Sequence, residues 1–397
     1  MTDWNIRLDS VQRSLRHLNL DGWLLYDFRR SNELACAFLE IPASTLLSRR
    51  FFYWIPMQGV PTKIVHRIEN SALDHLPGQT LHYSSWKELE ACLATMLKGS
   101  RSAAMEYSPR GVIPTISKVD AGTVELVRSF GIDVQSSADV LQTYTSVWTA
   151  EQLKTHVAAA KVLQSAVEAA WKFIADAISN GRHVGEIDVQ CFILEEFKKN
   201  DCICDHSPIC AVNAHSANPH YIPVASSSSE IRRGDFVLID VWCKKNVPGA
   251  VYADITRVGV VAAQPTEKQN AIFAIVRQAR DAAIDLIKQR LERGQTVRGY
   301  EVDQVCREVI VNAGYGDYFT HRTGHNIGER DHGHGANIDS YETQDYRLLL
   351  PGTCFSIEPG IYLPGEFGVR LEDDVYLDVD GKSLRLTPGM QYEIQLT

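Results

Sequence analysis

The chain has 397 residues, of which 45% are hydrophobic and 22% charged, and it carries a formal net charge of -9. This length exceeds one ordinary core and predicts two domains. The acidic balance, with no basic stripe, excludes a typical nucleic-acid-binding protein, and the lack of any run of about 18 apolar residues excludes a membrane-spanning helix.

The first residues, MTDWNIRLDS, lack the apolar segment of a secretory signal peptide. The nine cysteines are scattered along the chain and odd in number, which is typical of reduced thiols. Together these features predict a cytoplasmic protein.

Residues 1–145 are predicted to form an N-terminal α/β domain. Apolar runs typical of strands alternate with helical patterns; they are GWLLYDF (22–28) and FFYWIP (51–56), followed by the helical WKELEACLATMLKG from Trp86. The aromatic residues 51–54 could line a ligand site, but burial in a core is the simpler interpretation. We find no cluster of chemically active residues in this part of the sequence.

Residues 146–397 are predicted to form a second domain with an internal duplication. Thr149–Gln152 and Thr266–Gln269 each have the spacing of a capping box, and each opens a long helical pattern, ending near residues 179 and 294. A further segment follows in each half, from Gly185 and Gly299, and strand-like runs come next. This repeated order predicts a duplicated α/β (α+β) domain with a functional site between its halves.

Four strand-like runs in the second domain each contain a carboxylate among apolar residues. The runs are 236–242, 251–261, 353–362 and 367–377, and their carboxylates are Asp240, Asp254, Glu358 and Glu372. Each carboxylate alone is more simply interpreted as a solvated or arginine-paired residue at a strand end. Four buried carboxylates that converge would repel one another, and divalent cations are the natural compensation.

A histidine cluster, HRTGHNIGERDHGHG, lies between these strands and contains His321, His325, His332 and His334. Neutral imidazole is a common transition-metal ligand, and the glycines beside it allow backbone to approach a crowded site closely. A lone histidine here would be a hydrogen-bonded loop residue. The cluster and the four carboxylates together favour a metal site.

From about residue 150 onward the chain resembles the pita-bread metallopeptidases, which include methionine aminopeptidase, aminopeptidase P and prolidase. The family's metal ligands occur in the order Asp, Asp, His, Glu, Glu, and five residues match them here: Asp240, Asp254, His325, Glu358 and Glu372. The resemblance implies two divalent metal ions. Oxygen and imidazole ligands without thiolate suit manganese, cobalt or zinc rather than copper, and manganese is our first expectation.

Further matches extend the resemblance to catalysis and specificity. It implies catalytic roles for His220 and His332 beside the tetrahedral intermediate, and for Glu358 as general base and acid. His321 and Arg370 match residues of the proline-specific branch and are expected to bind substrate. The resemblance therefore implies hydrolysis of the peptide bond before proline in short peptides, by a dipeptidase or an aminopeptidase, and a possible homodimer.

The sequence departs from the family pattern around its first aspartate. The family has Asp-x-Gly where this chain has Asp240-Val241-Trp242, and the two aspartates are fourteen rather than eleven residues apart. An even separation lets both side chains lie on one sheet face if the turn permits it. We expect the metal site to persist and Trp242 to reshape its surroundings. The alternatives are another amidohydrolase of this fold, such as a creatinase-like enzyme, and a non-catalytic binding module.

Overall fold

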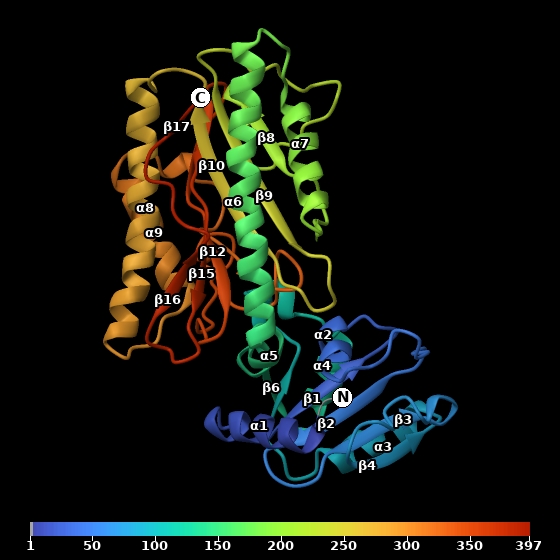
Figure 1. Ribbon diagram of the computed structural model, residues 1–397. Coiled ribbons are helices and arrows are strands. Elements are labelled where there is room, and N and C mark those ends of the chain that lie inside the picture. The colour runs from blue at the N-terminus through green and yellow to red at the C-terminus, as the bar shows by residue number, and fades with distance from the viewer. Residues whose placement is uncertain (1–2) are drawn as a thin grey trace. The chain divides into compact units, whose positions relative to one another are not determined.

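The computed structural model describes residues 3–397, which form two compact units that divide after Thr145. Each unit has its own sheets and helices (Figure 1). None of the helices within residues 3–397 combines the length and the apolar character needed to cross a bilayer.

The first unit is built on a six-stranded mixed sheet in the order β4-β3-β2-β1-β5-β6. The strands are β1 (Gly22–Asp27), β2 (Phe51–Pro56), β3 (Thr62–His66), β4 (Gln79–Tyr83), β5 (Ser102–Met105) and β6 (Asp133–Ser136). The helices are α1 (Trp4–His17), α2 (Glu33–Phe38), α3 (Trp86–Met96), α4 (Ala121–Ser129), α5 (Ala138–Thr145) and the 3-10 turns 67–69, 109–111 and 114–116. The aromatic residues of β2 are buried, as the core interpretation predicts.

The second unit contains two long helices that begin at the predicted capping boxes. They are α6 (Ala150–Ser179) and α8 (Glu267–Glu292). The Gln152 amide N–H donates to Thr149 Oγ1 at 3.2 Å, and the Gln269 amide N–H donates to Thr266 Oγ1 at the same distance. These bonds satisfy amide groups that the first turn of each helix leaves free, and they confirm both predicted helix starts.

The remaining elements of the second unit repeat the predicted order of helices and strands. The first half has α7 (Glu186–Lys199), β7 (Cys202–Ile203), β8 (Ile209–Val212), β9 (Phe236–Lys245), β10 (Ala253–Val260) and the 3-10 turn 213–217. The second half has α9 (Gly299–Asn312), β11 (Asn326–Ile327), β12 (Cys354–Ile357), β13 (Gly360–Leu363), β14 (Phe367–Arg370), β15 (Asp373–Leu377), β16 (Leu384–Thr387), β17 (Gln395–Leu396) and the 3-10 turn 316–318.

Strand β9 buries different residues on its two faces. Val237, Ile239 and Val241 belong to the apolar cluster beneath α6 and α7, and α6 lies across β9 and β10 (Figure 1). Phe236 and Leu238 alternate with them and pack into the core formed with α8 and α9. Because side chains alternate along a strand, Asp240 and Trp242 share the face of Phe236 and Leu238, which is the inner side of the domain.

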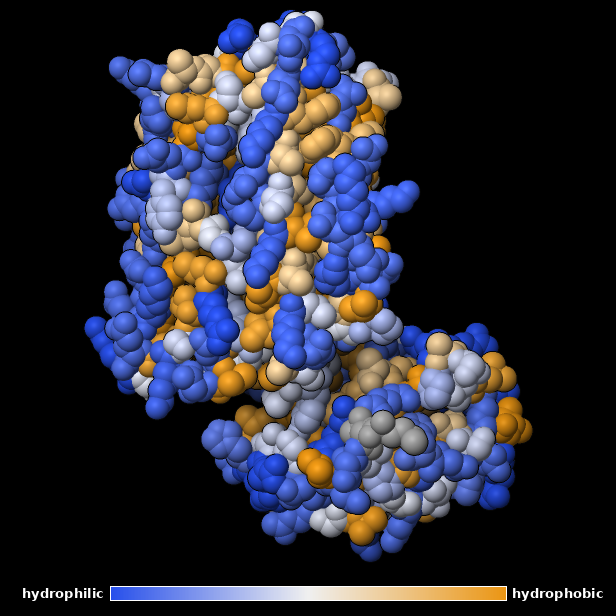
Figure 2. All heavy atoms as spheres, in the orientation of Figure 1, coloured by the Kyte–Doolittle hydropathy of each residue, from blue (hydrophilic) through white to orange (hydrophobic). Residues whose placement is uncertain are grey.

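Helices α6 and α7 also pack against each other. Phe173 of α6 stacks on Phe192 of α7 with ring centroids 4.7 Å apart. In Figure 2 the outer side of α6 is largely hydrophilic, whereas hydrophobic side chains gather along the line between the two helices. The pair therefore shields one side of the sheet and leaves the other for the second half of the domain.

Candidate metal centre

The β9–β10 hairpin places its two aspartates on one face of the sheet. Asp240 is directly opposite Thr256, and Asp254 is directly opposite Trp242. Opposed residues of an antiparallel pair point to the same side, so these four side chains face the inner core together. Although this hairpin is longer than in the family pattern, Asp240 and Asp254 still lie on the same face of the sheet, as their even separation allows.

The two glutamates lie at breaks in the sheet, which corrects the continuous strands predicted for 353–362 and 367–377. The pairing of β12 with β15 ends at Ile357 and Asp373, and that of β13 with β14 ends at Gly360 and Arg370. Glu358 and Glu372 fall in the gaps between the two ladders. Pro359 explains the first break because proline has no amide N–H to donate. The chain changes sheets at both glutamates, which frees their side chains from the regular pleat.

His325 lies between these carboxylates. Its Nε2 is 3.7 Å from Asp254 Oδ2 and 3.5 Å from Glu358 Oε1. The ligand atoms of His325, Asp254 and Glu372 all lie within 4.8 Å of one another. The Ser356 hydroxyl fixes this geometry, because its oxygen accepts from the His325 amide N–H at 3.0 Å while its proton goes to Glu358 Oε1 at 3.0 Å.

A network around Thr256 holds the carboxylates together. Thr256 Oγ1 is 2.9 Å from Asp240 Oδ1 and 2.7 Å from Glu372 Oε2, and it accepts a hydrogen bond from Arg370 Nε at 2.9 Å. A hydroxyl has one proton, so it can donate to only one of the two carboxylates at a time. Arg370 Nη2 also pairs with Asp240 Oδ2 at 2.5 Å. Arg370 is thus the cation that neutralises Asp240.

Several carboxylate oxygens of the cluster are buried without a hydrogen-bond partner among residues 3–397; they include Asp254 Oδ1, Glu372 Oε1 and Asp331 Oδ1. Burial, and then the charge of Glu372, raises the pKa of Asp254 well above its ordinary value, and burial does the same for the pKa of Glu372. Burial also raises the pKa of Glu358 to about 7. Buried carboxylate oxygens without hydrogen-bond partners need protons or cations to offset their charge. Together with an imidazole nitrogen, such oxygens suit divalent metal ions as ligands.

His321 and Arg370 are joined through Tyr362. His321 Nδ1–H donates to the Arg322 carbonyl at 2.7 Å, which leaves Nε2 to accept from the Tyr362 hydroxyl at 2.7 Å. The tyrosine oxygen in turn accepts from Arg370 Nη1 at 3.1 Å. Burial, reinforced by the charge of Arg370, lowers the pKa of His321 to about 3, so the ring is neutral. Both residues adjoin the metal cluster, and their predicted contact with substrate stays a prediction.

The two predicted catalytic histidines, His332 and His220, differ in their contacts. The His332 ring stacks on His325 with centroids 4.0 Å apart, and its Nδ1 accepts from Arg322 Nη2 at 3.2 Å. The His220 side chain is exposed and makes no hydrogen bond or ion pair with any of residues 3–397. Burial, and then the charges of Arg322 and His220, lowers the pKa of His332 to about 4, so both histidines lie near the cluster, and their catalytic roles stay predictions.

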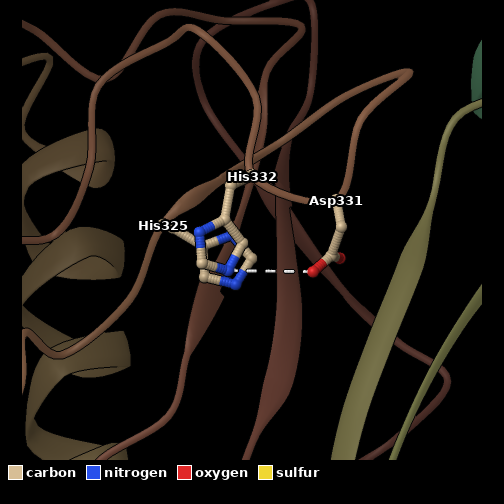
Figure 3. A group of neighbouring side chains, drawn as sticks. All are labelled: His325, Asp331 and His332. Carbon is tan, nitrogen blue, oxygen red and sulfur yellow. Dashed lines mark ion pairs between the residues drawn. The ribbon is translucent and has the colours of Figure 1, made fainter. Parts of the chain in front are cut away.

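Asp331 is the residue of the cluster that the sequence analysis did not single out. Its carboxylate lies beside His325 and His332 (Figure 3). Burial, and then the charges of Asp240 and Glu358, raises the pKa of Asp331 to about 7. An acidic residue directly before His332 in the histidine-rich segment was the available signal.

This arrangement offers the carboxylate and imidazole groups that a metal-dependent hydrolase needs. The pattern of metallopeptidase family M24 matches residues 154–378, and the chain belongs to this family. Similar proteins include the Xaa-Pro dipeptidase of Lactobacillus helveticus, 31% identical over 64% of this chain and 62% of that protein. The Xaa-Pro dipeptidase of Pyrococcus furiosus is 34% identical over 63% of this chain and 65% of that protein. In both cases the match spans less than two thirds of the relative.

Solved structures of other proteins superpose on nearly the whole length of this chain. The dipeptidase PepE of Mycobacterium ulcerans superposes with a TM-score of 0.70 and 22% identity, covering 99% of this chain and 97% of that one. The prolidase of Pyrococcus horikoshii gives a TM-score of 0.60 and 23% identity, with 98% and 99% covered. At identities this low the similarity establishes the fold alone. The superpositions confirm the predicted pita-bread domain with a smaller N-terminal α/β domain.

Proposed function

We propose that this metallopeptidase uses two divalent ions to hydrolyse the peptide bond before proline in short peptides, as an Xaa-Pro dipeptidase or Xaa-Pro aminopeptidase. The observation that carries the proposal is the convergence of Asp254, His325 and Glu372, with ligand atoms within 4.8 Å of one another. Two of these side chains contain a buried oxygen that has no hydrogen-bond partner within the part of the chain that the structure describes. The similarity to two Xaa-Pro dipeptidases supports the preference for proline.

Five residues would hold the ions: Asp240, Asp254, His325, Glu358 and Glu372. Among them, Asp254, His325 and Glu372 bring their ligand atoms within 4.8 Å of one another and would hold an ion together. Manganese suits this donor set best, with cobalt or zinc as alternatives. When bound, the ions supply Lewis acidity and make water nucleophilic at neutral pH.

The protein's own groups supply positioning and proton transfer. Glu358 is the candidate general base, because its carboxylate lies beside His325 and accepts a hydrogen bond from Ser356 at the centre of the cluster. His332 receives a hydrogen bond at Nδ1 from Arg322, so its neutral ring has its proton on Nε2. That N–H is available to stabilise a developing oxyanion. His220 would approach the substrate from the segment before β9.

Arg370, Tyr362 and His321 would form the side of the site that receives proline. Their hydrogen bonds run from Arg370 through Tyr362 to His321, and so fix the orientation of both rings. A neutral imidazole and a phenol ring offer apolar faces to a pyrrolidine ring. Arg370 itself forms an ion pair with Asp240 and donates a hydrogen bond to Thr256. Its main role would therefore be to fix the positions of these two side chains.

The test is hydrolysis of Ala-Pro beside Ala-Pro-Ala, each with added manganese and with chelator. Metal-dependent cleavage of the dipeptide alone would identify a dipeptidase, and cleavage of the first bond of the tripeptide an aminopeptidase. Glu358→Gln should lower kcat by at least about a hundredfold. Glu366→Gln is the matched control, because Glu366 is exposed and its side chain pairs with Lys268, away from the cluster. Absence of cleavage with bound metal would refute the proline assignment.

A further inference from the structure

Asp331 lies in the segment between β11 and β12, close to the cluster but outside the five matched ligands. Its Oδ2 is 3.7 Å from His332 Nε2, and the ligand atoms of Asp331, His325 and His332 lie within 4.8 Å of one another. Figure 3 shows the carboxylate directed at the two stacked imidazole rings. His325 thus belongs to two groups of potential ligands, one with Asp254 and Glu372 and one with Asp331.

The segment that carries Asp331 is fixed to the sheet by Asn326. The Gly333 amide N–H donates to the Asn326 carbonyl at 2.7 Å, and the Gly335 amide N–H donates to Asn326 Oδ1 at 2.8 Å. Asn326 Nδ2 donates to the Cys354 carbonyl at 2.9 Å. A Cβ on Gly333 would come within 2.3 Å of Asn326 Oδ1, so only glycine permits this approach. The position of Asp331 is therefore built into the fold.

The carboxylate of Asp331 is poorly satisfied by the protein itself. Its Oδ1 is buried and has no hydrogen-bond partner among residues 3–397. His332 cannot readily act as the metal ligand beside it, because Arg322 donates to Nδ1 and the ring proton then occupies Nε2. Of the two side chains, Asp331 is the one with free electron pairs directed at the cluster.

We propose that Asp331 is a further carboxylate ligand of the metal centre, on the ion that His325 binds. The inference rests on the proposed metal-dependent function. Two atoms bound to one ion at about 2.1 Å lie at most about 4.2 Å apart, so a small side-chain adjustment would bring Asp331 and His325 to a shared ion. When ionised, the carboxylates of Asp331 and the four matched acids carry five negative charges. Arg370 offsets one, and two divalent ions neutralise the remaining four.

The test is titration of the metal-free protein with manganese by calorimetry, for wild type and three variants. Asp331→Asn keeps the size of the side chain and should weaken binding of one ion by at least about tenfold. Glu329→Gln removes the same charge from an exposed residue two positions away and should leave binding unchanged. Glu358→Gln removes a matched ligand and should also weaken binding. A wild-type crystal soaked in manganese should show an Asp331 oxygen at bonding distance from an ion.

The outcomes separate this inference from the proposed function. Wild-type affinity in Asp331→Asn, with weakened binding in Glu358→Gln, would overturn the role of Asp331 and leave the metal centre intact. Unchanged affinity with a raised KM would also overturn it, and would make Asp331 a group that binds the substrate's ammonium. A wild-type protein that binds no divalent ion would refute both. Because the crystal uses wild type, poor folding of the variant cannot obscure the answer.

Discussion

Trp242 lies directly opposite Asp254 in the antiparallel β9–β10 pair, and both side chains face the inner core. The indole is half-buried and packs against two small apolar clusters, one containing Tyr252 and the other Tyr221. The family pattern that the sequence resembles implies glycine at this position. In this chain a large ring lies beside a proposed ligand, where that pattern would place no side chain.

Replacing Trp242 should widen the substrate site. Trp242→Ala is expected to raise the kcat/KM of Phe-Pro relative to Ala-Pro by about tenfold, since removed methylene and ring contacts are worth about 1–3 kcal/mol. It should also lower the free energy of unfolding by about 2–3 kcal/mol. Trp86→Ala is the control, because Trp86 is exposed in the first unit. An unchanged ratio of the two substrates would show that Trp242 does not border the substrate.

Thr256 should matter for metal affinity without being a ligand. Thr256→Val keeps the shape but removes the hydroxyl that contacts Asp240, Glu372 and Arg370. We expect manganese affinity to fall by about 10–100-fold, because the partners that orient ligands contribute that much. Calorimetric titration measures the effect. Thr343→Val, at a hydroxyl bonded to Asp339 outside the cluster, should retain wild-type affinity.

Arg370 should stabilise the metal-free protein strongly. Arg370→Leu leaves the Asp240 carboxylate buried without its cation, and the free energy of unfolding should fall by about 3–5 kcal/mol. Manganese should restore part of the loss, because the ions would replace the missing positive charge. Arg385→Leu breaks the exposed pair with Asp378 and should cost less than about 1 kcal/mol. Urea unfolding with and without manganese gives both values, and equal costs would contradict the prediction.

The gain in stability from metal should increase with pH. The pKa values of Glu358 and Asp331 are raised to about 7 in the folded metal-free protein, above the value of about 4 in an unfolded chain. Their contribution to stability is thus fully present below about pH 4 and is lost as the pH rises through 7. Metal binding requires the deprotonated carboxylates, so it competes with protons.

We therefore expect manganese to change the Tm little at pH 5 and to raise it by several degrees at pH 8. Thermal unfolding at several pH values, with manganese and with chelator, measures the difference between the two states. Comparing them at each pH removes the effect of other titrating groups, such as the buried His156. A manganese effect that is equal at pH 5 and pH 8 would contradict the linkage.

The second domain was largely predictable because its signals are local. The capping boxes at Thr149 and Thr266 fix the starts of α6 and α8 through bonds within one helical turn. The even separation of Asp240 and Asp254 allowed a shared face because strand side chains alternate with a period of two. The sequence did not predict the strand breaks at Glu358 and Glu372. A strand that changes its pairing partner can keep the same apolar pattern, so the pattern carries no sign of the break.

By itself, the sequence determined the family, the order of the five matched ligands and the duplicated succession of helices and strands. Tertiary structure alone decided that Arg370 neutralises Asp240, that the single proton of Thr256 lies between two carboxylates, and that Asp331 faces His325. The contacts of Arg370 and Thr256 join segments far apart in the chain, whereas Asp331 and His325 lie on one loop whose closure brings them together. Their distances depend on strand register and loop closure, and both are set by packing of the whole domain rather than by any local pattern.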